Sequence, residues 1–295
     1  MYYNEHTIVY YKGEYVKAQD LRCNIYDQSL HYGYGVFEGI RAYGTDNGVK
    51  IFKAKEHFDR MKFSCEAVHI PYPYDIDELI DISYTVLDKN HLRDAYIRPL
   101  ISCTPNMSLS KGISSQLLIA AWDWGAYLGH NLLDVMISSY SRPNPSGFKV
   151  AAKITGHYVN SILACQEAKD KGFDEALLLD VEGFVAEGPG ANVFFELDGR
   201  LITPQLGSIL PGITRATIIE ICNDLDIEVE ERKILPSEIM GIDSAFFCGT
   251  AAEVIGLQSI DRVPFRKEWD DSKGFLIQQA YKKLVLGKDY SLLVA

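Results

Sequence analysis

The residue with the clearest potential for chemistry is Lys153, which stands among small and apolar residues in the run 150–154. Burial disfavours the charged form of a lysine, so its pKa falls and the neutral nitrogen can attack an aldehyde. A lysine on a strand can instead protect a sheet edge from pairing with another chain. This segment alone leaves both interpretations open.

Three further segments carry the groups that a lysine-bound aldehyde cofactor would need. Glu187 ends a predicted strand at 184–187 and could keep a pyridine nitrogen protonated, and the Gly-Pro-Gly that follows lets the backbone approach a flat ring. The loop 210–215 leads into a predicted helix, where N–H groups and hydroxyls can bind phosphate. The run 249–252 ends in small residues after a strand. Each segment could also be a plain turn, but together they provide what pyridoxal phosphate requires.

Other motifs in the chain carry less weight. The run 33–39 is GxGxxxG, one residue longer than the dinucleotide fingerprint, and no βαβ unit accompanies it. The SxxK at 108–111 lacks its companion elements. There is no HExxH and no CxxC pair, so we expect neither a metal site nor a redox disulfide.

The elements that must hold these residues form two groups along the chain. The first group is a mixed α/β unit with a predicted hairpin at 7–16, helices at 54–68 and after Asp75, and strands at 95–101 and 116–122. Gly125 to Asn131 breaks the pattern. We therefore expect a small N-terminal domain over 1–124, an interdomain loop over 125–136 and a larger C-terminal domain over 137–295.

The second group is built on short strands, and its core is predicted to be a β-meander or barrel-like sheet. Its expected strands are 177–179, 184–187, 191–197, 200–202, 227–232 and 244–248, and its expected helices are 157–171 and 213–225.

Composition limits the classes of partner. The 295 residues carry a formal net charge of −11 at pH 7, so nucleic acid and anionic membranes are poor partners. No apolar run approaches the roughly 18 residues that a membrane span needs. The first residues show no export signal and the six cysteines are widely spaced, so we expect a cytoplasmic protein with reduced thiols.

Taken together, the motifs resemble those of the branched-chain amino acid aminotransferases, which are fold-type IV pyridoxal-phosphate enzymes. The resemblance covers nearly the whole chain and is carried by the runs 30–41, 56–60, 95–100, 124–129 and 210–215, with Lys153 and Glu187. It implies an α/β (mixed α+β) fold with two domains, the larger of which binds the cofactor.

The resemblance also implies roles for individual residues. Lys153 would be the Schiff-base lysine and proton shuttle, Glu187 the partner of the ring nitrogen, and Tyr158 the partner of the ring O3′. The phosphate would be held by Arg60, the Ile213 amide, Thr214 and Thr250.

For the substrates, the resemblance implies ping-pong exchange between leucine, isoleucine or valine and 2-oxoglutarate. The implied substrate-binding residues are Tyr32, Phe37, Gly39, Tyr96, Arg98, Trp124, Tyr127, Thr250 and Ala251. Among them, Arg98 would meet the γ-carboxylate of glutamate, although it could instead be a buried ion-pair partner that supports its strand. Tyr32 would reach the neighbouring subunit's site, so a homodimer is implied.

Several alternatives share the lysine and the glutamate. They are D-amino acid aminotransferases, R-selective amine transaminases and aminodeoxychorismate lyase. A non-catalytic relative that only binds the cofactor or a partner would need a lost catalytic residue, and none is visible. The loop 103–112 differs from the glycine- and valine-rich loop of the family, which leaves side-chain specificity open.

Overall fold

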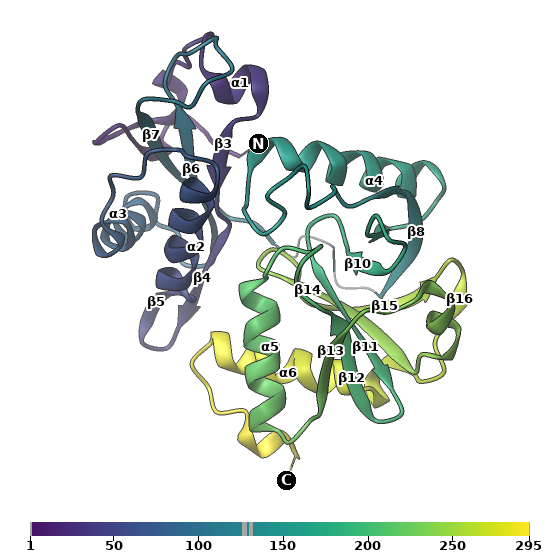
Figure 1. Cartoon of the computed structure of the whole chain (residues 1–295). Helices are drawn as coiled ribbons and strands as arrows, with labels where there is room; N and C mark the ends of the chain where they lie inside the picture. Colours follow the sequence, from purple (N-terminus) through teal and green to yellow (C-terminus); the bar gives the residue numbers. More distant parts are fainter. Residues whose placement is uncertain (1, 126–128, 130–131, 295) are drawn as a thin grey trace. The chain divides into compact units, whose positions relative to one another are not determined.

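The computed structural model describes residues 2–125, 129 and 132–294, and the chain divides into two compact units (Figure 1). Unit 1 contains residues 1–125 together with the short segment 152–157, and unit 2 contains the rest. The segment that carries Lys153 therefore belongs to unit 1, although it lies far along the chain. Of the predicted interdomain loop, residues 126–128 and 130–131 lie outside the described residues.

Unit 1 is a sheet of antiparallel strands with two long helices. The strand order is β2-β1-β7-β6-β4-β5, with β3 paired to β6. The strands are β1 (Ile8–Tyr11), β2 (Glu14–Lys17), β3 (Gly35–Phe37), β4 (Ile40–Thr45), β5 (Gly48–Ile51), β6 (Ala95–Cys103) and β7 (Ser115–Trp122). The helices are α1 (Gln28–Tyr32), α2 (Ala54–Ala67) and α3 (Ile76–Lys89). The predicted hairpin, helices and strands of this half are confirmed.

The helices of unit 1 form where the sequence pattern predicts them, and for the expected reasons. Phe58, Met61 and Cys65 recur at helical spacing on α2, and all three are fully buried in the core. The N-cap of α3 is Asp75, whose Oδ1 accepts a hydrogen bond from the Glu78 amide at 3.1 Å.

The segment 152–157 is tied to the rest of unit 1 by its backbone. Ile154 pairs with Val36 in an isolated bridge, and the Phe37 amide donates to the Lys153 carbonyl at 3.2 Å. At Gly33, whose φ is +62°, an added Cβ would lie 2.6 Å from the Gly156 Cα. The glycine therefore serves close backbone packing, which is a structural reason for the nucleotide-like GxGxxxG pattern.

Unit 2 is built on a mixed sheet of order β10-β9-β8-β15-β14-β11-β12-β13, with β16 paired to β15. The strands are β8 (Leu133–Ser141), β9 (Glu175–Leu179), β10 (Val185–Glu187), β11 (Asn192–Leu197), β12 (Arg200–Pro204), β13 (Val229–Arg232), β14 (Ser244–Gly249), β15 (Glu253–Ile260) and β16 (Val263–Pro264). The predicted continuous meander is wrong, because its strands form two separate hairpins, β9–β10 and β11–β12. Strands β8, β15 and β14 lie between them.

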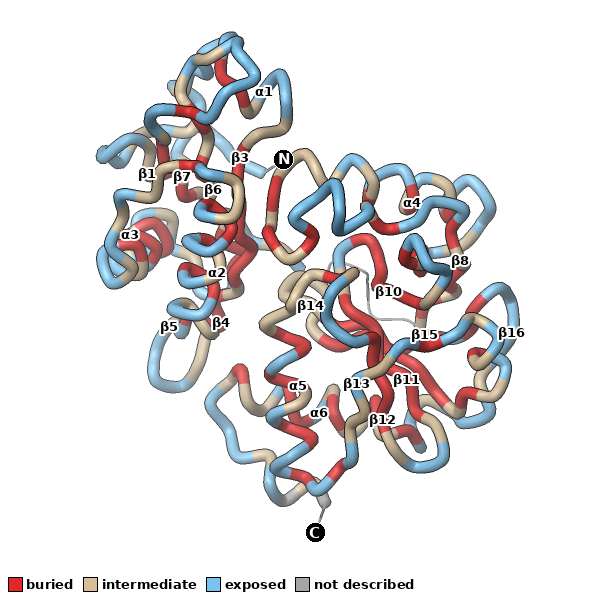
Figure 2. Tube along the Cα trace, in the orientation of Figure 1, coloured by how far each residue is buried: buried red, intermediate tan, exposed pale blue. Residues whose placement is uncertain are grey.

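Three helices accompany this sheet: α4 (Tyr158–Asp170), α5 (Ile213–Asp224) and α6 (Lys273–Val285). Figure 2 shows the central strands buried along most of their length, as in β11 and β14. Sequence analysis placed α4 and α5 but not α6 or β15. Within the described part of the chain, no helix combines the length and the hydropathy required to cross a membrane.

Candidate functional site

Lys153 lies in no strand, so the interpretation of this residue as an edge-protecting strand lysine is wrong. Its side chain is half-buried, and its Nζ lies 4.8 Å from the centroid of the Phe37 ring. Its own amide donates to Ser64 Oγ on α2 at 3.0 Å. The amine therefore lies over an aromatic ring, and the Lys153 backbone is fixed by hydrogen bonds to Ser64 and Phe37.

A buried carboxylate holds Arg60 in unit 1. Glu38 is fully buried between β3 and β4, and its two oxygens accept from Arg60 Nε at 2.7 Å and Nη2 at 2.8 Å. His57 Nδ1 lies 2.8 Å from Glu38 Oε2. Burial raises the pKa of Glu38, but the charge of Arg60, the neighbouring His57 and the hydrogen bonds from both outweigh it and hold that pKa well below its ordinary value. Arg60 is therefore oriented by a bidentate ion pair.

His57 is the third member of this buried cluster. Burial is the largest influence and lowers the pKa of His57, while the neighbouring Glu38 carboxylate opposes that shift. The neutral imidazole can still donate its Nδ1–H to Glu38.

Arg98 on β6 lies among aromatic rings. Its guanidinium carbon is 4.7 Å from the Phe37 ring centroid, 5.2 Å from that of Tyr96 and 5.8 Å from that of Trp122. Its Nη2 donates to the Tyr96 hydroxyl at 3.2 Å. Within the described ranges no carboxylate forms an ion pair with Arg98, and its buried Nε meets no hydrogen-bond acceptor. A buried, unsatisfied guanidinium donor is suited to a ligand carboxylate.

Of the other predicted substrate residues of unit 1, Gly39 and Trp124 lie against Tyr96, whereas Tyr32 lies on α1. Gly39 lies against Tyr96, because an added Cβ would be 1.9 Å from the Tyr96 hydroxyl oxygen. The Trp124 ring contacts Tyr96 edge-on at 4.7 Å between centroids. Tyr32 ends α1, is exposed, and donates its hydroxyl to the Met107 carbonyl at 3.1 Å. Tyr127 lies outside the described residues.

In unit 2, Glu187 is buried at the end of β10 and is held from several sides. Arg142 Nε lies 2.9 Å from its Oε1. The Asn192 side-chain amide donates to its Oε2 at 3.0 Å, and the Leu210 backbone amide reaches both oxygens at 3.2 Å. The Arg142 contact is an ion pair without hydrogen-bond geometry. An adjacent guanidinium and two amide donors therefore fix the orientation of this carboxylate.

The loop held by Glu187 leads into α5. The N-cap is Gly212, which has no side chain to cap the helix, and Ile213 and Thr214 open the first turn. Arg215 is committed elsewhere, to the Pro204 carbonyl at 3.0 Å and to Glu231 at 2.6 Å. An uncapped helix start with a threonine in its first turn is suited to a phosphate.

The remaining predicted residues of unit 2 lie at element ends. Tyr158 begins α4 and is half-buried. Thr250 and Ala251 form the turn between β14 and β15. At Gly249 an added Cβ would be 3.1 Å from the Gly190 carbonyl oxygen, so this turn lies close to the loop that follows Glu187.

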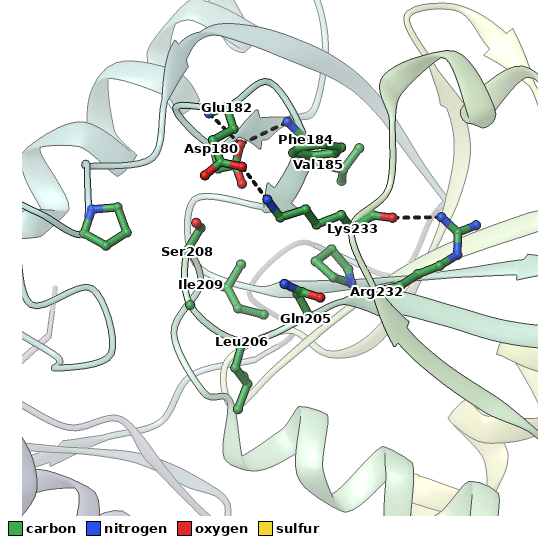
Figure 3. Close-up of a pocket in the computed structure, with 13 residues that line it drawn as sticks. Asp180, Glu182, Phe184, Val185, Gln205, Leu206, Ser208, Ile209, Arg232 and Lys233 are labelled. Carbon is green, nitrogen blue, oxygen red and sulfur yellow. Dashed lines mark hydrogen bonds and ion pairs between the residues drawn. The ribbon is translucent and has the colours of Figure 1, made fainter.

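A pocket of about 310 Å³ in unit 2 is lined in part by the 205–209 loop (Figure 3). Asp180, Glu182, Phe184 and Lys233 are among its lining residues, and Lys233 is paired with Glu182. The Asp180 carboxylate is occupied by the amides of Glu182 and Phe184. None of the predicted site residues lines this pocket. In the described residues, no three histidine, cysteine or acidic side chains are grouped to hold a metal ion.

Sequence analysis missed the residues that support the predicted ones. These are Glu38, His57, Trp122, Arg142 and Asn192. Glu38 and His57 lie inside runs that carry the family resemblance, and Asn192 lies in a predicted strand, so a search for buried partners of each predicted residue could have found them.

Comparisons with known proteins show which family the chain resembles. A family model described as amino-transferase class IV matches residues 35–260. The branched-chain-amino-acid aminotransferase of Pseudomonas aeruginosa is 39% identical over 290 residues, which cover 95% of this chain and 94% of the relative. The crystal structure of the branched-chain aminotransferase of the archaeon Thermoproteus uzoniensis with norvaline has a TM-score of 0.92 at 36% identity and covers 96% of both chains. The crystal structure of the branched-chain amino acid aminotransferase of Thermobaculum terrenum, in its PLP-form (holo-form), has a TM-score of 0.90 at 30% identity, covering 97% of this chain and 96% of the other.

Proposed function

This chain belongs to the class IV amino-transferase family, and we propose that it exchanges the amino group between leucine, isoleucine or valine and 2-oxoglutarate. It is an aminotransferase of fold type IV, and its cofactor is pyridoxal phosphate. The observation that carries the proposal is the half-buried Lys153 amine over the Phe37 ring, in a chain whose relatives over nearly its whole length are branched-chain aminotransferases.

The residues of unit 1 fit the cofactor and its reacting end. Pyridoxal phosphate, when bound, takes up the amino group at its aldehyde carbon and draws electrons from the substrate Cα into its ring. The Lys153 amine would hold the aldehyde carbon and would move the proton of the substrate Cα. Arg60, already oriented by Glu38, would bind the phosphate.

The residues of unit 2 would serve the ring nitrogen, the ring oxygen and the phosphate. Glu187 is held by the Asn192 amide and the Arg142 guanidinium and would accept the N–H of a protonated ring nitrogen. The Tyr158 hydroxyl would bind O3′. The Ile213 amide, Thr214 and Thr250 would donate to the phosphate, which suits the uncapped start of α5.

The two kinds of substrate side chain would share the aromatic group around Arg98. The branched alkyl chain would contact Phe37, Gly39, Trp124 and Tyr127. Tyr32 of a neighbouring subunit would also contact it. For glutamate, Arg98 would pair with the γ-carboxylate, and its unsatisfied Nε supports that role. The α-carboxylate would bind Tyr96 and the amides of Thr250 and Ala251. One methylene contributes only about 0.8 kcal/mol, so kcat/KM for valine, leucine and isoleucine should agree within about two decades.

Borohydride reduction followed by peptide mass mapping tests the role of Lys153, because reduction fixes the cofactor to the amine that binds it. We expect the adduct on Lys153, and we expect Lys153→Ala to abolish turnover of L-leucine with 2-oxoglutarate. Lys149→Ala, four residues away at an exposed position, is the matched control and should be fully active. An adduct elsewhere, or more than a trace of transamination by Lys153→Ala, would refute the assignment.

The same assay separates the proposed activity from the other fold-type IV reactions. A D-amino acid or R-amine transaminase would use another donor, and aminodeoxychorismate lyase would release pyruvate without an amino acceptor. Glu187→Gln should slow the proton transfer far more than it weakens cofactor binding. If Glu187→Gln instead weakens cofactor binding more than it slows the proton transfer, Glu187 serves only to bind the cofactor.

We also propose that the enzyme is a cytoplasmic homodimer. A patch on unit 1, which we call the α1 patch, consists of exposed apolar residues on α1 and on the nearby 105–113 segment. It contains Leu30, Tyr32, Met107, Leu109 and Ile113. Exposed clusters of this kind mark interfaces, and the second copy of this chain is the proposed partner. Leu109→Asp with Ile113→Asp should lower the mass measured by analytical ultracentrifugation; an unchanged mass would reject this patch as the contact.

A further inference from the structure

The side chain of Asn192 joins two parts of unit 2 that the proposed function uses separately. Its Nδ2 donates to Glu187 Oε2 at 3.0 Å and to the Leu210 carbonyl at 3.1 Å. The Leu210 amide in turn donates to the Glu187 carboxylate at 3.2 Å. These bonds close a ring through one carboxylate, one amide side chain and one backbone residue. Asn192 is buried, at 5% exposure, so the ring is shielded from water.

Gly212 shows how closely Asn192 is packed against the start of α5. A Cβ added at Gly212 would lie 2.0 Å from Asn192 Oδ1. The backbone there has φ −70° and ψ 132°, which any residue can adopt. Gly212 is therefore required mainly by the space that Asn192 occupies, and it is the N-cap of the helix whose first turn carries Ile213 and Thr214.

We infer that Asn192 is a positioning residue that fixes Glu187 relative to the start of α5. The inference rests on the proposed function, in which Glu187 binds the ring nitrogen of the cofactor and the start of α5 binds its phosphate. In the cofactor, the ring nitrogen and the phosphate are joined by one rigid ring and a short CH2–O linker, so their separation varies only within a narrow range. A protein that binds both must hold its two binding groups at a matching separation before the ligand arrives.

The physical consequence is a difference between a ligand that spans both groups and one that meets a single group. Pyridoxamine phosphate would contact the ring-nitrogen partner and the phosphate partners together, without a covalent bond to Lys153. Inorganic phosphate would contact only the phosphate partners. Loss of Asn192 should therefore weaken the first ligand and leave the second nearly unchanged.

The experiment titrates the full-length chain, freed of cofactor, with pyridoxamine phosphate and separately with inorganic phosphate. We expect Asn192→Ala to raise the Kd for pyridoxamine phosphate about 10-fold or more, because a hydrogen bond to a charged group is lost, and to change the Kd for phosphate less than about twofold. The matched control is Asn90→Ala in unit 1. Asn90 also bonds backbone groups through its amide, at Ile8 and Val86, so its loss should lower Tm without changing either Kd.

A double-variant cycle tests the inference from the other side of the contact. In the wild-type chain, Gly212→Ala should displace Asn192 and raise the Kd for pyridoxamine phosphate as Asn192→Ala does. In the Asn192→Ala background the clash with Oδ1 is absent, so the same glycine change should alter that Kd less than about twofold. Gly212→Ala also carries the test if Asn192→Ala does not fold.

The outcomes separate this inference from the proposed function. If the wild-type chain does not bind pyridoxamine phosphate, the proposed function fails and the inference fails with it. If the wild type binds it and Asn192→Ala or Gly212→Ala binds it equally well, only the inference is overturned. Equal losses for pyridoxamine phosphate and inorganic phosphate, or additive effects in the cycle, would also overturn it, since they indicate general damage to the site.

Discussion

The buried acid Glu38 offers the sharpest test of how unit 1 is held together. Glu38→Gln keeps the size of the side chain but removes the charge that Arg60 and His57 share. Breaking one partner of a buried ion pair costs about 3–5 kcal/mol, and glutamine retains part of the hydrogen bonding, so we expect a loss of about 3 kcal/mol. For a domain of this size that loss corresponds to a fall in Tm of roughly 6–12 °C.

Thermal unfolding followed by near-ultraviolet circular dichroism is a suitable assay, because two of the three tryptophans, Trp122 and Trp124, belong to unit 1. The control is Glu182→Gln, which removes a carboxylate from an ion pair with Lys233 in which both side chains are largely exposed. Exposed pairs contribute about 0–1 kcal/mol, so its Tm should hardly change.

The dependence on pH gives the same prediction an independent check. The folded-state pKa of Glu38 is lowered from its ordinary value of 4.5, so its stabilising contribution is complete above that value and is lost as the pH falls through the folded-state pKa. The gap in Tm between wild type and Glu38→Gln should therefore be constant from pH 8 to 6 and shrink below pH 4.5. A Tm for Glu38→Gln within about 2 °C of that for Glu182→Gln, or a gap that widens in acid, would refute the reasoning.

Three further predictions follow from unit 1. His57 is buried and its pKa is lowered, so the stability of the wild type should fall as the pH drops below the ordinary histidine value of 6.5. The His57→Asn side chain can still donate to Glu38 but does not titrate. This variant should therefore show a smaller change in Tm between pH 7.5 and 5.5 than the wild type. Arg98→Met should reduce kcat/KM for L-glutamate about 100-fold and that for L-leucine less than about fivefold, measured as separate half-reactions; equal losses would argue against a role in binding the γ-carboxylate. Gly39→Ala should lower kcat/KM for both substrates at least about 10-fold, because its Cβ meets the Tyr96 hydroxyl at 1.9 Å; unchanged kinetics would show that the ring moves aside freely.

The fold could be predicted from the sequence where the pattern depends on short-range chemistry. The α2 stripe of Phe58, Met61 and Cys65 and the Asp75 cap of α3 are local signals, and the structure contains both helices. The order of strands in unit 2 could not be predicted in the same way. Strands β15 and β14 enter between β8 and β11 through pairings between distant parts of the chain, for which periodicity gives no signal.

The assignment of segment 152–157 to unit 1 could not be predicted from the sequence pattern either. The segment 152–157 follows the first strand of unit 2 along the chain, yet it bonds to Gly33, Phe37 and Ser64 of unit 1. A prediction that assigns contiguous ranges to domains cannot place it. The signal was nevertheless in the sequence, since Gly33 and Gly156 are both glycines and an added Cβ at Gly33 would collide with the Gly156 backbone.

The residues of the candidate site are of two kinds, which differ in how well the sequence alone identifies them. Groups proposed to touch the cofactor, such as Lys153 and Glu187, are recognisable because their chemistry is unusual in their sequence surroundings. Groups that hold them, such as Glu38 and Asn192, are ordinary polar residues whose importance comes only from burial and a specific partner. Both units contain a buried carboxylate that is fixed by donors from neighbouring segments of the chain. Such a carboxylate need not reorganise when charge develops during the reaction, and electrostatic catalysis depends on that property. Substitutions of Glu38 and Asn192 should therefore affect binding and turnover even though neither residue is assigned a contact with the reacting atoms.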